Sequence, residues 1–218
     1  MNMNILITGA RGFIGKNLIA TLHNIADGKD RSFGLDPEIT IFEYDIDTDP
    51  MLLDGYCKNA DFVFHLAGVN RPQNPEEFME GNFGFTSTLL ELLKKYENNC
   101  PIMISSSIQA ALSNPYGESK KAGENLMFAY GKETGARVCV YRFPNVFGKW
   151  CRPNYNSAVA TFCNNIANDL PITVSDRNIQ LELLYIDDLV TEMLDALEGR
   201  EHRRIDGDFC VVPTTHNI

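Results

Sequence analysis

The sequence predicts an α/β fold: a Rossmann-like, doubly wound parallel sheet with a small C-terminal substrate-binding part. Apolar, strand-like runs alternate with helical patterns along the 218 residues. This alternation is typical of a parallel sheet that is covered by helices on both faces. The first five strand-like runs lie within about 145 residues of the start, which suits a doubly wound sheet.

Composition excludes several other classes of protein. Hydrophobic residues make up 44% of the chain and charged residues 22%, a balance too apolar for long intrinsic disorder. The net charge of −10 repels phosphate backbones, so we expect no nucleic-acid partner. No apolar run reaches the roughly 18–20 residues of a membrane span, and the N-terminus lacks the basic segment of a signal peptide. We therefore expect a cytoplasmic protein with no membrane partner.

The six cysteines indicate free thiols. They form no C-x-x-C pair, and their spacings match no zinc pattern. We expect neither a disulfide scaffold nor a bound metal. The cysteines are Cys57, Cys100, Cys139, Cys151, Cys163 and Cys210.

The first strand and the first helix follow each other directly. Residues 4–8 are an apolar run of strand length, and residues 13–26 place Leu18 and Leu22 on one helical face. Residues 27–38 are polar and contain glycine, which predicts a loop.

The remaining elements alternate in the same way. A helix is expected over residues 76–97, although Gly81 and Gly84 weaken its first half. After a polar stretch, an apolar run at residues 209–212 ends without a closing helix, so we expect the C-terminal part to be incomplete. The other expected strands are 39–44, 61–66, 102–106, 137–143 and an extended run at 179–185, and the other expected helices are 116–134, 157–168 and 187–197.

Two parts follow from this order of elements. We expect residues 1–148 to form a nucleotide-binding domain that also carries the reactive side chains. Residues 149–218 are expected to form the substrate-binding part, interleaved with the same domain.

Three glycines follow the first strand with the spacing of a dinucleotide-binding turn. Gly9 permits the tight turn, Gly12 lets the backbone approach a pyrophosphate, and Gly15 lets helix and strand pack closely. The helix N-terminus, with Phe13 and Ile14, adds free N–H groups and the positive end of the helix dipole. This context predicts an NAD(P) site, the alternative being a plain structural turn.

Two charged residues bear on which dinucleotide is bound. Arg11 lies inside the turn, where its guanidinium suits the 2′-phosphate of NADP(H). Asp45 follows the second strand, where a carboxylate would accept a hydrogen bond from the free 2′-hydroxyl of NAD(H). Either residue is otherwise a solvated loop charge. We favour NADP(H) and keep NAD(H) as the alternative.

A serine, a tyrosine and a lysine lie at the positions needed for carbonyl reduction. Three serines, residues 105–107, end the fourth strand at the sheet edge where ligands bind. Tyr116 and Lys120 are four residues apart and share one helix face. A phenol has a pKa near 10 and needs a neighbouring cation to exchange protons at neutral pH. Tyr116 is then the proton donor to a carbonyl oxygen as hydride arrives from a nicotinamide. The alternative is a surface helix with an amphipathic tyrosine and lysine.

These motifs resemble the extended short-chain dehydrogenase/reductases that act on nucleotide sugars, the NAD-dependent epimerase/dehydratase family. The resemblance covers essentially the whole chain and is most specific toward the capsular-polysaccharide reductases of the CapF type. It is carried by residues 8–15, 65–72, 105–110, 142–157, Asn82, Tyr116 and Lys120.

The resemblance implies reduction of the 4-keto group of a UDP-linked N-acetylated 6-deoxy sugar, with NADPH as donor. It implies that Ser107 is the catalytic serine beside Tyr116 and Lys120, with Ser106 as the fallback. Implied cofactor contacts are Gly9, Arg11, Gly12, Phe13, Ile14, Gly15, Asp45, Leu66, Ala67, Gly68, Asn82, Ser105, Tyr116, Lys120, Phe143 and Pro144. Implied substrate contacts, each otherwise a solvated polar residue, are Arg71, Ser107, Gln109, Asn145, Lys149, Asn154, Asn156 and Arg177.

Other chemistries are weighed on the same residues. Ile108 and Gln109 follow the serine and cannot ionise, which disfavours a sugar dehydratase. An NAD-dependent 4-epimerase is the alternative that Asp45 supports, and a non-catalytic redox sensor is a second one. CapF-type proteins continue into a cupin domain for epimerisation, and no such domain follows here, so we do not expect that activity. Apolar faces at residues 86–93 and 121–129 predict either a homodimer or core packing.

Overall fold

A five-stranded parallel sheet organises the fold. The computed structural model describes residues 2–174, 178 and 180–213. The strand order is β2-β1-β3-β4-β5, and every neighbouring pair is parallel. The chain winds outward from β1 to β2 and then returns through β3 to β5, which confirms the predicted doubly wound sheet and places its switch point between β1 and β3. The strands are β1 (Met3–Thr8), β2 (Ile39–Tyr44), β3 (Phe62–His65), β4 (Ile102–Ser107) and β5 (Val138–Phe143).

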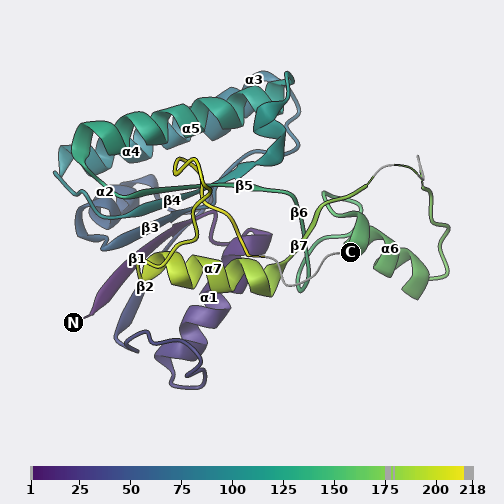
Figure 1. Cartoon of the computed structure of the whole chain (residues 1–218), viewed down its shortest axis with the longest axis horizontal. Helices are drawn as coiled ribbons and strands as arrows, with labels where there is room; N and C mark the ends of the chain where they lie inside the picture. Colours follow the sequence, from purple (N-terminus) through teal and green to yellow (C-terminus); the bar gives the residue numbers. More distant parts are fainter. Residues whose placement is uncertain (1, 175–177, 179, 214–218) are drawn as a thin grey trace.

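Helices cover both faces of this sheet (Figure 1). α1 and α7 lie side by side on one face, and α2, α4 and α5 lie on the other. The helices in chain order are α1 (Phe13–Ala26), α2 (Pro50–Asn59), α3 (Glu76–Phe78), the π-helix η1 (Met79–Gly84), α4 (Phe85–Lys95), the 3-10 helix η2 (Ile108–Ala111), α5 (Pro115–Thr134), α6 (Ala158–Ala167) and α7 (Ile186–Leu197).

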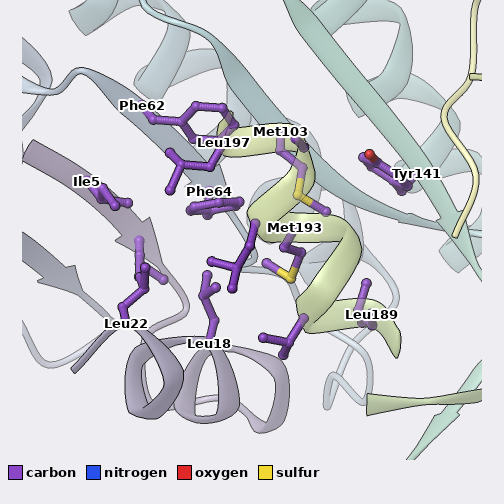
Figure 2. Close-up of a cluster of buried hydrophobic side chains, with 14 of the residues drawn as sticks. Ile5, Leu18, Leu22, Phe62, Phe64, Met103, Tyr141, Leu189, Met193 and Leu197 are labelled. Atoms are coloured by element: carbon purple, nitrogen blue, oxygen red, sulfur yellow. The ribbon is translucent and has the colours of Figure 1, made fainter. Parts of the chain in front are cut away.

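The strands are apolar throughout because both of their faces are buried. Ile5 and Phe64 point toward α1 and α7, whereas Leu6 and Val63 point toward α2, α4 and α5. Figure 2 shows the first of these two cores, where Met193 of α7 lies among the side chains of α1 and the sheet. Continuous apolar runs in the sequence therefore mark central parallel strands.

A small lobe extends beyond the C-terminal edge of the sheet (Figure 1). It consists of α6 and a two-stranded parallel ribbon formed by β6 (Asn145–Phe147) and β7 (Leu183–Tyr185). α6 has an apolar sequence, yet none of its residues is fully buried. The lobe therefore adds little to the main cores.

The end of the described chain returns to the sheet. α7 packs on α1, and Cys210 donates its backbone N–H to the carbonyl of Val140 at 2.9 Å. Cys210 also forms a parallel bridge with Tyr141, so this segment lies along the free edge of β5. Some residues after 148 thus belong to the lobe, whereas others pack on α1 and on the edge strand β5 of the main sheet.

Some elements differ from the sequence-based expectations. The helix predicted over residues 76–97 is divided into α3, η1 and α4, and the two glycines that weaken the helical pattern both lie in the π-helical segment η1. α2 was not predicted, although Asp49 caps its first turn and Pro50 occupies its first position. Strand β7 is shorter than the expected run at 179–185, of which residue 179 lies outside the described residues.

Two further observations concern partners. The apolar faces at residues 86–93 and 121–129 are partly used within the chain, since Leu89, Leu93 and Met127 are buried in the core on that side of the sheet. A homodimer thus stays a prediction. Among the described residues, the longest apolar helix falls short of what a membrane crossing requires.

Candidate active site

The turn between β1 and α1 is packed so tightly that it requires glycine. Gly9 has a φ of +71°, and a Cβ there would lie 2.7 Å from the backbone nitrogen of Ala67. A Cβ on Gly15 would lie 2.4 Å from the carbonyl oxygen of Gly9. Gly12 caps α1 without a side-chain hydrogen bond, so the first-turn N–H groups have no capping oxygen. This cradle fits a pyrophosphate, the group that such helix ends bind.

The two charged residues that bear on cofactor choice are linked to each other. The carboxylate of Asp45 accepts the backbone N–H of Arg11 at 2.7 Å and that of Ile46 at 2.8 Å. The exposed Arg11 guanidinium forms an ion pair with Asp47. Beside them lies an open groove of about 320 Å³ whose charged and aromatic lining residues are Arg11, Lys16, His23, Glu43 and Trp150.

The three serines at the end of β4 have different partners. Ser105 is buried, and its carbonyl oxygen accepts a hydrogen bond from Nζ of Lys120 at 3.1 Å. Ser106 is also buried and donates to the carboxylate of Glu124 at 2.6 Å. The half-buried Ser107 lies near enough to Tyr116 for its hydroxyl to lower the pKa of the phenol. Ser107, rather than Ser106, thus lies beside the tyrosine.

Tyr116 and Lys120 lie next to each other, close to Ser107. The Lys120 ammonium is 5.9 Å from the centroid of the Tyr116 ring. Burial raises the pKa of the Tyr116 phenol, while the neighbouring Ser107 hydroxyl acts in the opposite direction. Burial also lowers the pKa of Lys120 to about 8. The structure therefore brings the predicted serine, tyrosine and lysine into one group.

The start of α5 fixes the position of Tyr116. The side chain of Asn114 caps the helix by accepting the N–H of Gly117 at 2.8 Å, and Pro115 occupies the first helical position. A Cβ on Gly117 would lie 2.2 Å from the carbonyl oxygen of Gln109. Only glycine allows α5 to begin this close to η2, where Ser107 also ends its strand.

A buried chain of hydrogen bonds links the cofactor turn to the catalytic helix. Thr8 Oγ1 lies 2.8 Å from His65 Nδ1, and His65 Nε2 lies 2.8 Å from Thr86 Oγ1. Because the Thr86 hydroxyl donates to the carbonyl oxygen of Asn82 at 2.5 Å, His65 must donate from Nε2 and accept from Thr8 at Nδ1. Burial lowers the pKa of His65 to about 3, which keeps the imidazole neutral.

Asn82 continues this chain toward the active site from the π-helical segment η1. Its amide exchanges two hydrogen bonds with the backbone of Val69, at 2.9 and 3.1 Å. It also donates to the hydroxyl of Ser119 at 2.9 Å. A Cβ on Gly68 would lie 2.8 Å from Asn82 Oδ1 and 2.9 Å from Nζ of Lys120. The backbone of the loop after β3 therefore lies directly against Lys120.

Some of the predicted substrate contacts converge on one loop. Arg71 donates from Nε to Oδ1 of Asn156 at 3.1 Å and from Nη1 to the carbonyl oxygen of Asn154 at 3.3 Å. Its guanidinium lies 5.0 Å from the ring centroid of Tyr155. Tyr155 lies near enough to affect the pKa of Tyr116, in the raising direction. Tyr155 was not predicted, although it lies between two residues that were.

The remaining predicted residues have separate surroundings. The Gln109 backbone N–H bonds to the Ser107 hydroxyl at 3.2 Å, and the Asn145 amide donates to the carbonyl oxygen of Glu182 at 3.4 Å. Lys149 lies elsewhere: its ammonium is 4.0 Å from the centroid of Trp150, and its carbonyl accepts the Asn17 amide at 2.9 Å. Phe143 is buried, Pro144 and Leu66 are half-buried, and Arg177 lies outside the described residues.

A group of possible metal ligands on α7 has another use. Glu192, Asp195 and His202 bring their ligand atoms within 4.8 Å of one another. Glu192, however, accepts the Tyr141 hydroxyl at 2.5 Å, the His202 backbone N–H at 2.9 Å and lies 2.6 Å from His202 Nδ1. Its carboxylate therefore fastens the returning chain to β5.

Comparisons with known proteins agree with this geometry. The NAD dependent epimerase/dehydratase family matches residues 5–210. Over 198 residues the chain is 43% identical to the UDP-2-acetamido-2,6-beta-L-arabino-hexul-4-ose reductase of Pseudomonas aeruginosa, covering 91% of this chain and 50% of that protein.

Solved structures point the same way. The capsular polysaccharide assembling protein CapF of Staphylococcus aureus superposes with a TM-score of 0.82 at 46% identity, covering 97% of this chain and 54% of that one. The UDP-glucuronic acid 4-epimerase of Bacillus cereus, solved with UDP-glucuronic acid and NAD, gives a TM-score of 0.70 at 25% identity, covering 90% and 73%. The chain thus spans about half the length of the reductase and of CapF.

Proposed function

The chain belongs to the NAD dependent epimerase/dehydratase family, and from this premise we propose that it reduces the 4-keto group of a UDP-linked N-acetylated 6-deoxy sugar with NAD(P)H. The observation that carries the proposal is the 43% identity to a protein named as a UDP-sugar hexul-4-ose reductase. The 4-epimerase alternative is supported by a more distant relative, at 25% identity. Production of surface polysaccharide is part of the proposal, because a second relative is named for capsule assembly.

The chain offers a fitting site for the dinucleotide. Gly9 and Gly15 let the turn pack closely, and Gly12 leaves the start of α1 without a capping side chain, which suits a pyrophosphate. When bound there, the cofactor supplies the hydride that converts the carbonyl carbon to an alcohol carbon. The backbone of Ala67 and Gly68 would line the same site, since the loop after β3 contacts both the turn and Lys120.

Tyr116 would supply the proton that the new alcohol oxygen needs. Ser107 lies beside the Tyr116 hydroxyl, so the serine would orient the carbonyl oxygen while the phenol donates to it. The Lys120 ammonium, 5.9 Å from the ring centroid, favours the phenolate that remains. Such proton transfer contributes typically 10²–10⁴-fold to a rate.

We favour NADPH as the donor. Both oxygens of Asp45 already accept backbone N–H groups, from Arg11 and Ile46. The groove along α1 presents the basic side chains of Arg11 and Lys16, which complement a 2′-phosphate, beside His23 and one acidic residue, Glu43. The proposal extends to a cytoplasmic location, which localisation of the tagged protein in cells would test.

The test is whether the purified protein reduces a UDP-4-keto-sugar, with the reaction monitored by the loss of NADPH absorbance. We expect turnover with the wild type and a loss of at least about 100-fold in Tyr116→Phe, with NADPH binding retained. Tyr56→Phe is a matched control, since that ring stacks on Phe42 away from Ser107. Tyr116→Phe turning over like the wild type would exclude the proton-donor role, and NAD-dependent epimerisation instead of reduction would establish the alternative.

A further inference from the structure

Glu124 is a buried acidic residue of α5 that the reaction described above does not use. Only 1% of its surface is exposed. It follows Lys120 by four residues on the same helix, a spacing that places side chains next to each other. A buried carboxylate is costly unless it is paired, so its surroundings must stabilise the negative charge.

Side chains from two strands of the sheet stabilise this negative charge. Ser106 of β4 donates to Oε1 of Glu124 at 2.6 Å. Arg142 of β5 donates from Nε to Oε1 at 2.8 Å and from Nη2 to Oε2 at 2.6 Å, the two-pronged geometry of a strong Arg–carboxylate pair. The Arg142 guanidinium in turn lies 4.3 Å from the ring centroid of Phe209, in the segment that returns to β5.

Lys120 depends on this pair for its charge. Its ammonium is buried and bonds to a neutral acceptor, the Ser105 carbonyl oxygen, at 3.1 Å. The titratable groups around it are Tyr116 and Glu124 on α5 and the neutral His65 on β3. Burial pulls the pKa of Lys120 down, and the negative charge of Glu124 acts against that fall.

We propose that Glu124 is a positioning residue whose buried carboxylate, held by Ser106 and Arg142, keeps Lys120 in its ammonium form beside Tyr116. The inference rests on the proposed function for the role of Lys120 in the reaction. The geometry gives Arg142 a second effect: by neutralising part of the carboxylate charge, it limits how strongly Glu124 acts on Lys120.

The test measures the titration of Lys120 directly, by NMR of isotope-labelled lysine ε-carbons, with Lys120→Arg used to assign the signal. Glu124→Gln keeps the shape and removes the charge, so the pKa of Lys120 should fall by about one unit or more, the size of effect that a neighbouring opposite charge produces. Arg142→Gln removes the opposing cation, so the same pKa should rise. A role limited to packing would not produce shifts of opposite sign.

Glu133→Gln is the matched control, since this exposed glutamate on α5 pairs with Lys94 at 3.1 Å. It should leave the Lys120 titration unchanged. No shift in Glu124→Gln, or a fall in both variants, overturns the inference. Should Glu124→Gln fail to fold, the Arg142→Gln result decides: a rise supports the inference and an unchanged pKa rejects it. Because the titration needs no turnover, failure of the keto-sugar assay would reject the proposed function alone.

Discussion

Arg71 and Asn156 lie 85 positions apart in the sequence, yet the Arg71 side chain donates a hydrogen bond to the Asn156 amide oxygen at 3.1 Å. The bond connects the loop after β3, which lies against the cofactor turn, to the segment that leads into α6. Both residues are among those that we propose as contacts to the sugar nucleotide. Substrate binding should therefore be sensitive to this contact.

We expect Arg71→Ala to raise KM for the nucleotide sugar roughly tenfold, which corresponds to about 1.4 kcal/mol of lost binding. Two hydrogen bonds and the contact with Tyr155 are removed together. Steady-state kinetics at saturating NADPH measure the change. Arg152→Ala removes an equally exposed arginine from the same segment, so an equal rise in that control would show that only surface charge matters.

Arg11 should distinguish the two cofactors. We expect Arg11→Ala to weaken NADPH binding about tenfold, with little effect on NADH, because only NADPH carries the 2′-phosphate that a guanidinium binds. Fluorescence titration with each cofactor measures both values. Lys29→Ala, which removes an exposed cation paired with Asp27 beyond the other end of α1, serves as the control. Equal weakening of both cofactors in Arg11→Ala would instead indicate a role for this side chain in the shared part of the dinucleotide site.

His65 should make the fold sensitive to acid. Its folded-state pKa is about 3, below the ordinary value of 6.5, so the unfolded chain binds the proton more readily. Stability that is present above pH 6.5 is then lost as the pH falls toward 3, by about 2 kcal/mol at pH 5. Urea unfolding at about pH 7.5 and 5 measures the loss. His65→Asn should reduce this pH dependence, whereas His23→Asn, at an exposed position, should not; equal slopes in all three proteins would contradict the assignment.

Two glycine substitutions in helices should change the stability of the protein in opposite directions. Gly15→Ala places a methyl group 2.4 Å from the Gly9 carbonyl oxygen, so we expect a loss of at least about 2 kcal/mol and weaker dinucleotide binding. A Cβ on Gly55 in α2 has open space around it, and Gly55→Ala should stabilise the protein by about 0.5–1 kcal/mol. Chemical denaturation gives both values. A stable Gly15→Ala protein that binds NADPH normally would disprove the close-packing argument.

Local signals in the sequence were sufficient for most of the sheet. The predicted ranges 13–26 and 39–44 coincide with α1 and β2. In both segments the apolar pattern along the chain was enough to predict the type of element and its ends. α2 carried a readable signal in Asp49 and Pro50, but only two of its residues, Leu53 and Cys57, are buried. β6 and β7 have three residues each, too short for any periodicity.

The candidate site divides in the same way. The turn glycines, Tyr116 and Lys120 could be predicted because each has a fixed spacing from a neighbouring element, whereas Ser107 was chosen among the three serines by the family resemblance. Glu124 could not be linked to its partner Arg142 on β5, because that pair arises only when β4, β5 and α5 pack together. The hydrogen bond between Arg71 and Asn156 likewise depends on a lobe whose position no local pattern specifies.

The parallel pairing of β6 with β7 has a mechanical consequence. β6 joins the sheet at its first residue, through β5, whereas β7 joins α7 at its last, so the ribbon is anchored at opposite ends. A ribbon that is attached to the main domain at both ends cannot rotate about either end as a hinge. Arg71 provides a further link from the lobe to the main sheet, through its hydrogen bonds to Asn154 and Asn156 in the segment before α6.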